Sequence, residues 1–290
     1  GTGHGKEHRR VACRFLSARQ GRFAVIDAQQ AMWLGLVQGL TEFLPISSSG
    51  HLILVTDLLG WPDQGLAFDV AVHLGTLLAV LAYFRRDVAA IIGGWLLRLR
   101  GGDSTPEARL GGLIVIGTVP AVIAGLLLGS SIDTVLRNPL VIALTTIFFG
   151  LVLWWADAKG RRERQIDSLT GRDALLIGIA QALALIPGTS RSGITMTAAL
   201  MLGFTRQAAA RFSFLLSMPL ILAAGSLKGL ELAQSGTATQ WHEILLGVAF
   251  SFVAAWLCIK LFLAALDRIG MMPFVIYRLL LGIALFVWAT

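Results

Sequence analysis

Charged residues are scarce in this sequence. Only 14% of its 290 residues are Asp, Glu, Lys or Arg, whereas an average soluble domain has roughly 25%. Hydrophobic residues make up 56% of the chain, and the mean hydropathy is +0.74. This composition excludes an ordinary soluble domain and predicts an integral membrane protein.

Cysteine is nearly absent as well. The chain has Cys13, in a basic N-terminal stretch, and Cys258, in an apolar run, so the sequence predicts neither a disulfide framework nor a cysteine metal site. The net charge of +7 is compatible with nucleic-acid binding, but no nucleic-acid-binding module is visible. The basic residues lie in loops beside apolar runs, where anionic membrane lipids are the simpler partner.

Long apolar runs dominate the rest of the chain. Two stretches, 24–59 and 174–204, are interrupted by Pro, Gly and Ser, and we expect each to form a re-entrant pair of half-helices. None of the runs alternates as a membrane β-strand does, so the predicted fold class is an all-α polytopic membrane protein. Six further runs are long enough to cross a bilayer: 68–84, 111–130, 139–156, 212–230, 244–266 and 273–290.

Lysine and arginine in the short loops predict the orientation. Segments 85–110 and 157–173 are rich in Arg, whereas 131–138 has only Arg137 and 231–243 has no basic residue. The first two are expected in the cytoplasm and the others outside. The first broken segment then enters and leaves from the external face, and the second from the cytoplasmic face.

The N-terminal residues 1–22 disagree with this orientation, because they are basic and it places them outside. They contain no apolar core of a secretory signal. We interpret them as a disordered or artificially added extension before a single membrane domain, 23–290. The alternative is a basic arm on the cytoplasmic leaflet, which would invert the topology.

The two broken segments carry the same polar pattern. Because they are predicted to enter from opposite faces, they indicate an inverted-topology repeat, about 24–156 and 174–290, with the site near the midplane where they meet. Identical positions in an ungapped register include Gly35/Gly178, Gln38/Gln181, Leu40/Leu183, Ser47/Ser190, Ser49/Ser192, Gly50/Gly193, Leu59/Leu202 and Gly60/Gly203.

The first polar segment begins with Gln38 and Glu42, one helical turn apart. Their oxygens are expected on one face of a half-helix, where they could hold Mg²⁺ or Ca²⁺ together with a substrate phosphate. Alternatively, both side chains only satisfy backbone groups freed by the helix break. A carboxylate inside the membrane is, however, a functional candidate by default.

Three hydroxyls and an imidazole follow, at Ser47, Ser48, Ser49 and His51. They supply a possible nucleophile, a base and donors to an anion. At least one of the serines is expected to cap the next helix instead. Capping does not account for His51, which suits acid–base or nucleophilic work near neutral pH.

The second polar segment concentrates hydroxyl and backbone donors around one guanidinium, at Thr189, Ser190, Arg191, Ser192 and Gly193. Helix N-termini and arginine both bind phosphate oxygens, so the segment predicts a phosphate site. It is not a Walker motif. The alternative is that Arg191 pairs structurally with Glu42 across the repeat interface. Together the two segments suggest a site for a lipid phosphate at membrane depth.

These motifs resemble the bacterial undecaprenyl-diphosphate phosphatases of the bacitracin-resistance type. The resemblance rests on Gln38–Glu42, which fits a Glu/Gln-x-x-x-Glu motif, on the segment 43–51 and on the segment 187–193, and it extends from about residue 24 to the C-terminus. It implies hydrolysis of undecaprenyl diphosphate to undecaprenyl phosphate and inorganic phosphate, which recycles the lipid carrier for peptidoglycan synthesis and confers bacitracin resistance. It also implies a bacterial inner-membrane protein that requires a divalent metal and opens toward the periplasm.

Gln38 departs from the family pattern, because many members have Glu there. A neutral amide binds a cation less strongly, so Glu42 and the substrate phosphates are expected to hold the metal. The phosphates are expected to be bound by Arg191, together with Ser190, Ser192, Thr189, Gly193, Ser47 and Ser49.

The sequence does not decide which group is the nucleophile. We expect Ser48 activated by His51; the alternatives are His51 itself, through a phosphohistidine, and a metal-bound water. Arg278 could reach the same cavity, but we expect it to snorkel to the headgroups. His73 is expected to be a rim or packing residue.

A different class of function is also compatible with the pattern. Inverted repeats with broken helices are a transporter architecture, so the chain could translocate a lipid phosphate instead of, or besides, hydrolysing it. A pure transporter would need Arg191 but neither Ser48 nor His51. Small-residue patches such as 121–125 leave a homodimer possible.

Overall fold

The computed structural model describes residues 26–62, 64–135, 138–235 and 241–289. The predicted N-terminal extension, 1–22, lies outside them. The described residues form helices and contain no β-strand, only an isolated bridge between Arg164 and Phe204. The all-α prediction is confirmed.

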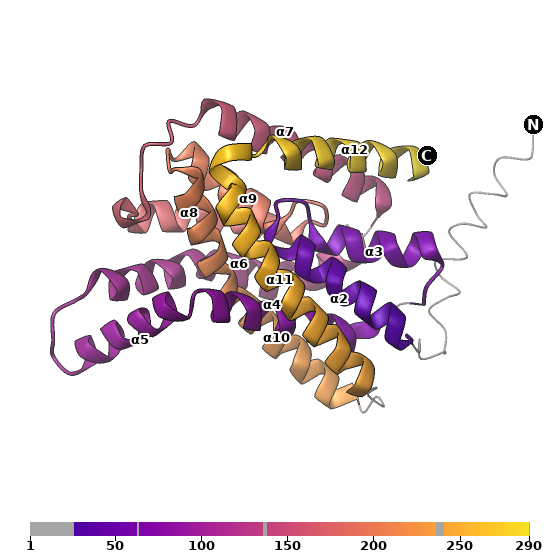
Figure 1. The fold of residues 1–290 in the computed structure, drawn as a ribbon, viewed down its shortest axis with the longest axis horizontal. Helices are drawn as coiled ribbons and strands as arrows, with labels where there is room; N and C mark the ends of the chain where they lie inside the picture. The colour runs from indigo at the N-terminus through magenta and orange to yellow at the C-terminus, as the bar shows by residue number, and fades with distance from the viewer. Residues whose placement is uncertain (1–25, 63, 136–137, 236–240, 290) are drawn as a thin grey trace, which may run out of the picture.

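The helices follow one another along the chain with short connections (Figure 1). They are α2 (Ala28–Phe43), α3 (Ser48–Leu59), α4 (Gly65–Tyr83), α5 (Arg85–Leu99), α6 (Pro106–Val135), α7 (Pro139–Lys159), η1 (Ile166–Ser168), α8 (Gly171–Ala182), η2 (Leu183–Leu185), α9 (Arg191–Met201), α10 (Arg206–Ser235), α11 (Trp241–Ile269) and α12 (Met272–Ala289).

Six helices are long and apolar enough to cross a membrane, and each overlaps one predicted span. They cover Gly65–Tyr83, Pro106–Leu128, Pro139–Lys159, Arg206–Glu231, Trp241–Ile269 and Met272–Ala289. Many large apolar side chains on them are exposed, for example Leu127 at 74% and Val287 at 69%. Such exposure is costly in water and favourable in lipid. The chain is therefore a multi-pass membrane protein.

The two broken segments are helix–turn–helix units, as predicted. In the first, α2 stops before Pro45 and α3 starts at Ser48; in the second, α8 and η2 stop before Pro187 and α9 starts at Arg191. Proline cannot donate a backbone hydrogen bond and disfavours helix before it, which explains both breaks.

The two units share an unusual backbone feature at paired positions. Ser47 and Ser190, the residues just before α3 and α9, have φ of 74° and 70°, and Gly60 and Gly203, just after these helices, have φ of 62° and 86°. Positive φ costs little for glycine but is uncommon for serine. The two turns therefore have matching conformations, consistent with the repeat predicted from the sequence.

Packing around the units matches as well. α2 packs on α11 and α8 packs on α6. A Cβ atom on Gly35 would lie 2.7 Å from the carbonyl oxygen of Gly247, and one on Gly178 would lie 2.4 Å from that of Gly117. Each half-helix therefore approaches its neighbour so closely that only glycine fits.

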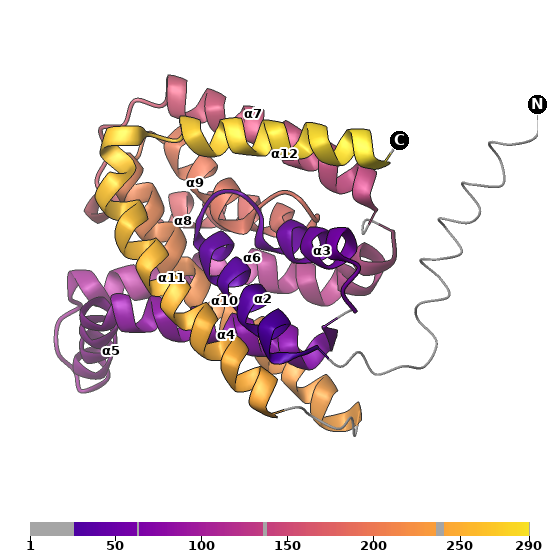
Figure 2. The ribbon, with the colours of Figure 1, turned by 45° about the vertical axis from the view of Figure 1, so that its right-hand side comes forward.

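The units point toward each other from opposite ends of the molecule. In Figures 1 and 2, α3 ends on the right, whereas the loop before α8 lies on the left. Their turns meet in the middle, where Ser192 Oγ donates to the carbonyl oxygen of Leu44 at 2.7 Å. This places the two polar segments together, as the repeat requires.

The start of α8 is fastened outside the spans by Asp173 and Arg164. Asp173 completes a capping box with Thr170, and its carboxylate accepts two hydrogen bonds from Arg164, at 3.1 and 2.7 Å. Burial raises the pKa of Asp173, but the hydrogen bonds from Arg164 and Thr170 lower it more, so that it falls from 3.8 to about 2. Because the folded-state pKa is depressed, the carboxylate stabilises the fold above pH 3.8 and loses this effect as the pH falls toward 2.

We therefore expect Asp173→Asn to lower the free energy of unfolding at pH 7 by about 2 kcal/mol. Denaturant unfolding in detergent at pH 7 and near pH 2.5 measures this, and the difference between variant and wild type should shrink at the lower pH. Asp167→Asn, at an exposed carboxylate in the same loop, is the control. Equal losses in both variants would contradict the prediction.

Candidate active site

An ion pair between the two broken segments forms the centre of the site. Arg191 Nη2, in the first turn of α9, lies 2.8 Å from Glu42 Oε1, in the last turn of α2. Both side chains are largely buried, with 11% and 7% of their surface exposed. The pairing that the sequence left as an alternative for Arg191 is thus formed. A buried pair of this kind is strongly coupled, since removing one charge leaves the other uncompensated.

The second carboxylate oxygen of Glu42 accepts two further hydrogen bonds. Gln38 Nε2 donates to Glu42 Oε2 at 3.0 Å, and Ser48 Oγ donates to the same atom at 2.7 Å. Gln38 and Glu42 share a helix face, as their spacing predicted. Ser48 is thus held by the carboxylate, with its proton directed at a base.

His51 is positioned by other partners. Its Nδ1 lies 2.6 Å from the carbonyl oxygen of Ser47, and its Nε2 lies 2.5 Å from the hydroxyl of Tyr277 in α12. A carbonyl can only accept, so Nδ1 carries the proton and the Tyr277 hydroxyl donates to Nε2. His51 was expected to activate Ser48, but the described residues show no hydrogen bond between them, because both ring nitrogens have other partners.

The predicted phosphate-binding residues of the second segment mostly have partners within the protein. Ser190 caps α9 by accepting from the backbone N–H of Gly193 at 3.2 Å, and Ser192 donates to Leu44. Thr189 differs, because its hydroxyl is buried and has no hydrogen-bond partner within the part of the chain described. Buried polar atoms are nearly always satisfied, so this hydroxyl is available to a ligand.

Arg278 does not snorkel; that expectation was wrong. The residue is fully buried, and its guanidinium donates to four backbone carbonyl oxygens: those of Pro45, Thr146, Gly188 and Thr189, at 3.0 to 3.2 Å. The helix breaks free the carbonyls of Pro45, Gly188 and Thr189 from helical hydrogen bonding, and in a membrane each of them needs a donor. That need outweighs the attraction of the headgroups.

The family model described as "Bacitracin resistance protein BacA" matches residues 31–284, a range that includes every residue of this site. The chain belongs to the BacA family. It is 68% identical over 265 residues to an undecaprenyl-diphosphatase of Chromohalobacter salexigens, covering 91% of this chain and all of that protein. An undecaprenyl-diphosphatase of Hahella chejuensis is 62% identical over 88% of this chain and 96% of its own length.

Two residues of this BacA-family site were not singled out by the sequence. Tyr277 approaches His51 from the last helix, and His73 Nε2 lies 3.9 Å from Glu42 Oε2, although His73 was expected at the rim or in packing. Neither belongs to a short motif with Glu42 or His51. The sequence offered only two signals for them, a histidine within an apolar span and a tyrosine next to an arginine in the last span.

The donor set that could hold a cation is small. Among the described residues, no group of three or more His, Cys, Asp or Glu side chains is arranged to bind a metal. Gln38 Oε1, however, is buried without a partner, and Glu42 Oε1 retains a lone pair beside the one that Arg191 occupies. An amide oxygen, a carboxylate and substrate phosphates are the oxygen ligands that Mg²⁺ and Ca²⁺ prefer. The residues present fit a hard cation.

Ser49 lies in α3 at the position paired with Ser192, but its side chain is outside the described part of the structure. Ser47 and Gly193 are placed beside the other site residues. A Cβ atom on Gly193 would lie 2.9 Å from Arg278 Nη1 and 3.1 Å from Ser190 Oγ. Gly193 therefore gives Arg278 room to reach the turn.

Proposed function

We propose that this membrane-embedded site hydrolyses undecaprenyl diphosphate to undecaprenyl phosphate and inorganic phosphate, and so returns the lipid carrier to peptidoglycan synthesis. The same activity would confer bacitracin resistance. The observation that carries the proposal is the contact of Glu42 with Ser48 and Arg191, which joins a base, a hydroxyl and a phosphate-binding cation at one point. Membership in the BacA family, with relatives that are undecaprenyl-diphosphatases, supports it.

Ser48 is the proposed nucleophile. Its hydroxyl lies 2.7 Å from Glu42 Oε2, so the carboxylate can take the proton as the oxygen attacks the terminal phosphorus. The bond from Ser48 Oγ to phosphorus forms, the phosphoric anhydride bond breaks, and undecaprenyl phosphate leaves. Water then hydrolyses the phosphoserine and releases inorganic phosphate. His51 is proposed to take the proton of that water at its unprotonated Nε2, in exchange for the hydrogen bond from Tyr277.

Arg191 and Thr189 are proposed to bind the transferred phosphate. The guanidinium offsets the charge that develops on the phosphoryl oxygens, and the unpartnered hydroxyl of Thr189 supplies a donor. The first backbone amides of α9 have no helical acceptor and favour an anion at the same end. When the phosphate enters, Arg191 can share its donors between Glu42 and the substrate.

Gln38 and Glu42 are the proposed ligands of a divalent cation, Mg²⁺ or Ca²⁺. A cation there would supply charge neutralisation for the diphosphate and make the departing phosphate a better leaving group. The orphaned Gln38 Oε1 supports this assignment. Residues Gln38 and Glu42 then orient the diphosphate relative to Ser48.

The proposed location is the bacterial inner membrane, with the site opening to the periplasm. The arginine-rich loops, 85–110 and 157–173, lie at the end of the molecule where α8 begins, and the positive-inside rule assigns that end to the cytoplasm. α3 returns to the other end. We infer that the substrate diphosphate reaches Ser48 and His51 from the periplasmic side.

The test is phosphate release from undecaprenyl diphosphate by purified protein. We expect release that stops with EDTA and returns with Mg²⁺ or Ca²⁺, and that falls by at least about 10³-fold in Ser48→Ala. Acid-quenched reactions with ³²P-labelled substrate should trap phosphate on Ser48. Label on His51 instead would make histidine the nucleophile. Binding of the lipid without release under any metal condition would favour the transporter alternative.

A further inference from the structure

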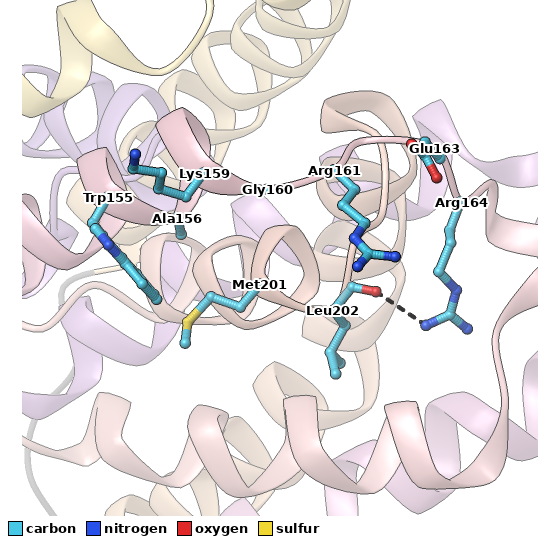
Figure 3. A pocket seen from close by; sticks show the side chains of 10 residues that line it. Trp155, Ala156, Lys159, Gly160, Arg161, Glu163, Arg164, Met201 and Leu202 are labelled. Carbon is cyan, nitrogen blue, oxygen red and sulfur yellow. Dashed lines mark hydrogen bonds between the residues drawn. The ribbon is translucent and has the colours of Figure 1, made fainter.

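A cavity lies away from the active-site residues, where α7 and α9 end. Its volume is about 530 Å³, and it is lined by the end of α7, the loop that follows and the residues after α9 (Figure 3). Ligand cavities usually measure roughly 300–1,000 Å³. Met201 in its wall is ten residues beyond Arg191 on α9, which corresponds to about 15 Å of helix. The cavity is thus separate from the catalytic residues.

Three cations line this cavity, and they do not play the same role. Arg164 is held by Asp173, by the carbonyl oxygen of Leu202 and by the ring of Phe204, so it belongs to the fold. Lys159 and Arg161 are exposed and have no hydrogen-bond or ion-pair partner in the described ranges. These two cations give the cavity a local positive charge that favours an anion.

One carboxylate, that of Glu163, also lines the cavity. Figure 3 shows it at the edge, beside Arg164 and on the far side from Lys159 and Trp155. The Asp173 carboxylate is already paired with Arg164. The cavity therefore keeps a net positive charge at Lys159 and Arg161.

The side of the cavity near Lys159 also carries large apolar side chains. Trp155 and Met201 are 50% and 53% exposed, and Figure 3 shows them on the same side as Lys159. Tryptophan beside the headgroup level and lysine just beyond it are typical of a membrane–water interface. A ligand that fills this cavity would have an anionic group among the cations and a hydrocarbon part against Trp155 and Met201.

We propose that the cavity is a binding site for an anionic glycerophospholipid of the cytoplasmic leaflet. Its phosphate and headgroup lie along the part of the cavity that carries Arg161 and Lys159, and its acyl chains run along Trp155 and Met201. Basic cavities at the cytoplasmic ends of membrane helices bind such headgroups through charge and hydrogen bonds. A bound lipid would brace the loop that fastens α8, and α8 belongs to the broken segment that carries Arg191.

The test uses the purified full chain in phosphatidylcholine nanodiscs, titrated with phosphatidylglycerol and analysed by native mass spectrometry. Lys159→Gln/Arg161→Gln should weaken phosphatidylglycerol binding by about tenfold or more, since each cation near the surface contributes roughly 1 kcal/mol. Arg98→Gln/Arg100→Gln removes the same charge from the end of α5 and should leave binding within about twofold. Phosphate release from undecaprenyl diphosphate reports that both variants are folded.

Three results would overturn the proposal. Equal losses of phosphatidylglycerol binding in the two double variants would mean that the lipid is attracted by the surface charge in general. If the wild-type protein does not bind phosphatidylglycerol in preference to phosphatidylcholine, the cavity is not a site for anionic lipid. Displacement of the bound lipid by inorganic phosphate, or by undecaprenyl phosphate at equal concentration, would assign the cavity to those ligands instead. These outcomes do not depend on the catalytic mechanism, because no residue of the active site is changed.

Discussion

Replacing Glu42 by glutamine is expected to reduce kcat/KM for phosphate release by at least about 10³-fold, a loss of roughly 4 kcal/mol of transition-state stabilisation. The amide has nearly the same shape, so the variant should fold. It cannot take the proton of Ser48, it no longer balances the buried charge of Arg191, and it weakens the proposed cation site. The measurement is steady-state release of phosphate across a range of Mg²⁺ or Ca²⁺ concentrations.

Gln38→Glu is the matched control, because it places the opposite change one helical turn away on the same face. We expect it to retain activity and to lower the metal concentration needed for half-maximal release, since a carboxylate holds a hard cation better than an amide. Full activity in Glu42→Gln would contradict the assignment of Glu42 and Gln38 as cation ligands. A higher metal requirement in Gln38→Glu than in wild type would contradict it as well.

Replacing Arg278 by methionine is expected to destabilise the protein by about 3 kcal/mol or more and to reduce activity strongly. Methionine approximates the volume but leaves the carbonyl oxygens of Pro45, Gly188 and Thr189 without this donor. Each unsatisfied buried group costs about 1–3 kcal/mol, part of which relaxation of the structure recovers. Both turns of the active site would lose the contact that fixes them. Thermal inactivation half-life in detergent and kcat together measure the effect.

Arg268→Met, at an exposed arginine at the end of α11, is the control and should change the half-life little. Arg278→Lys should restore only part of the stability, because an ammonium lacks the fork that reaches Pro45, Thr146 and Gly188 together. Wild-type stability in Arg278→Met would contradict this role.

Hydropathy and helix breakers were sufficient to predict most of the fold. Each predicted span coincides with a helix, since no soluble alternative exists for runs of that length. Pro45 and Pro187 located the breaks, and the shared pattern of Gln, Ser and Gly indicated that the broken segments meet. Glu42 and Arg191 were chosen because an ionised side chain in hydrocarbon is expensive unless it has a partner.

The partners of those residues were less predictable. Ser48 is one turn from His51 and six residues from Glu42, and the sequence alone could not show that the turn bends Ser48 back to the carboxylate. The partners of Arg278 are backbone carbonyls, which every residue has, so no side-chain pattern could reveal them. Tyr277 reaches His51 only because α12 packs on α7 beside the second turn. The local periodicity of a sequence does not predict such long-range packing.

Arg278 also limits how the two halves of the protein can move. One guanidinium is tied to Pro45 in the first turn and to Gly188 and Thr189 in the second, so neither turn can shift without stretching a bond to the other. A transporter that rocks one half against the other would have to break these hydrogen bonds in every transport cycle. Inside the membrane, no water is present to replace the lost donors. These hydrogen bonds suit an enzyme whose active-site geometry stays fixed while the lipid binds and leaves.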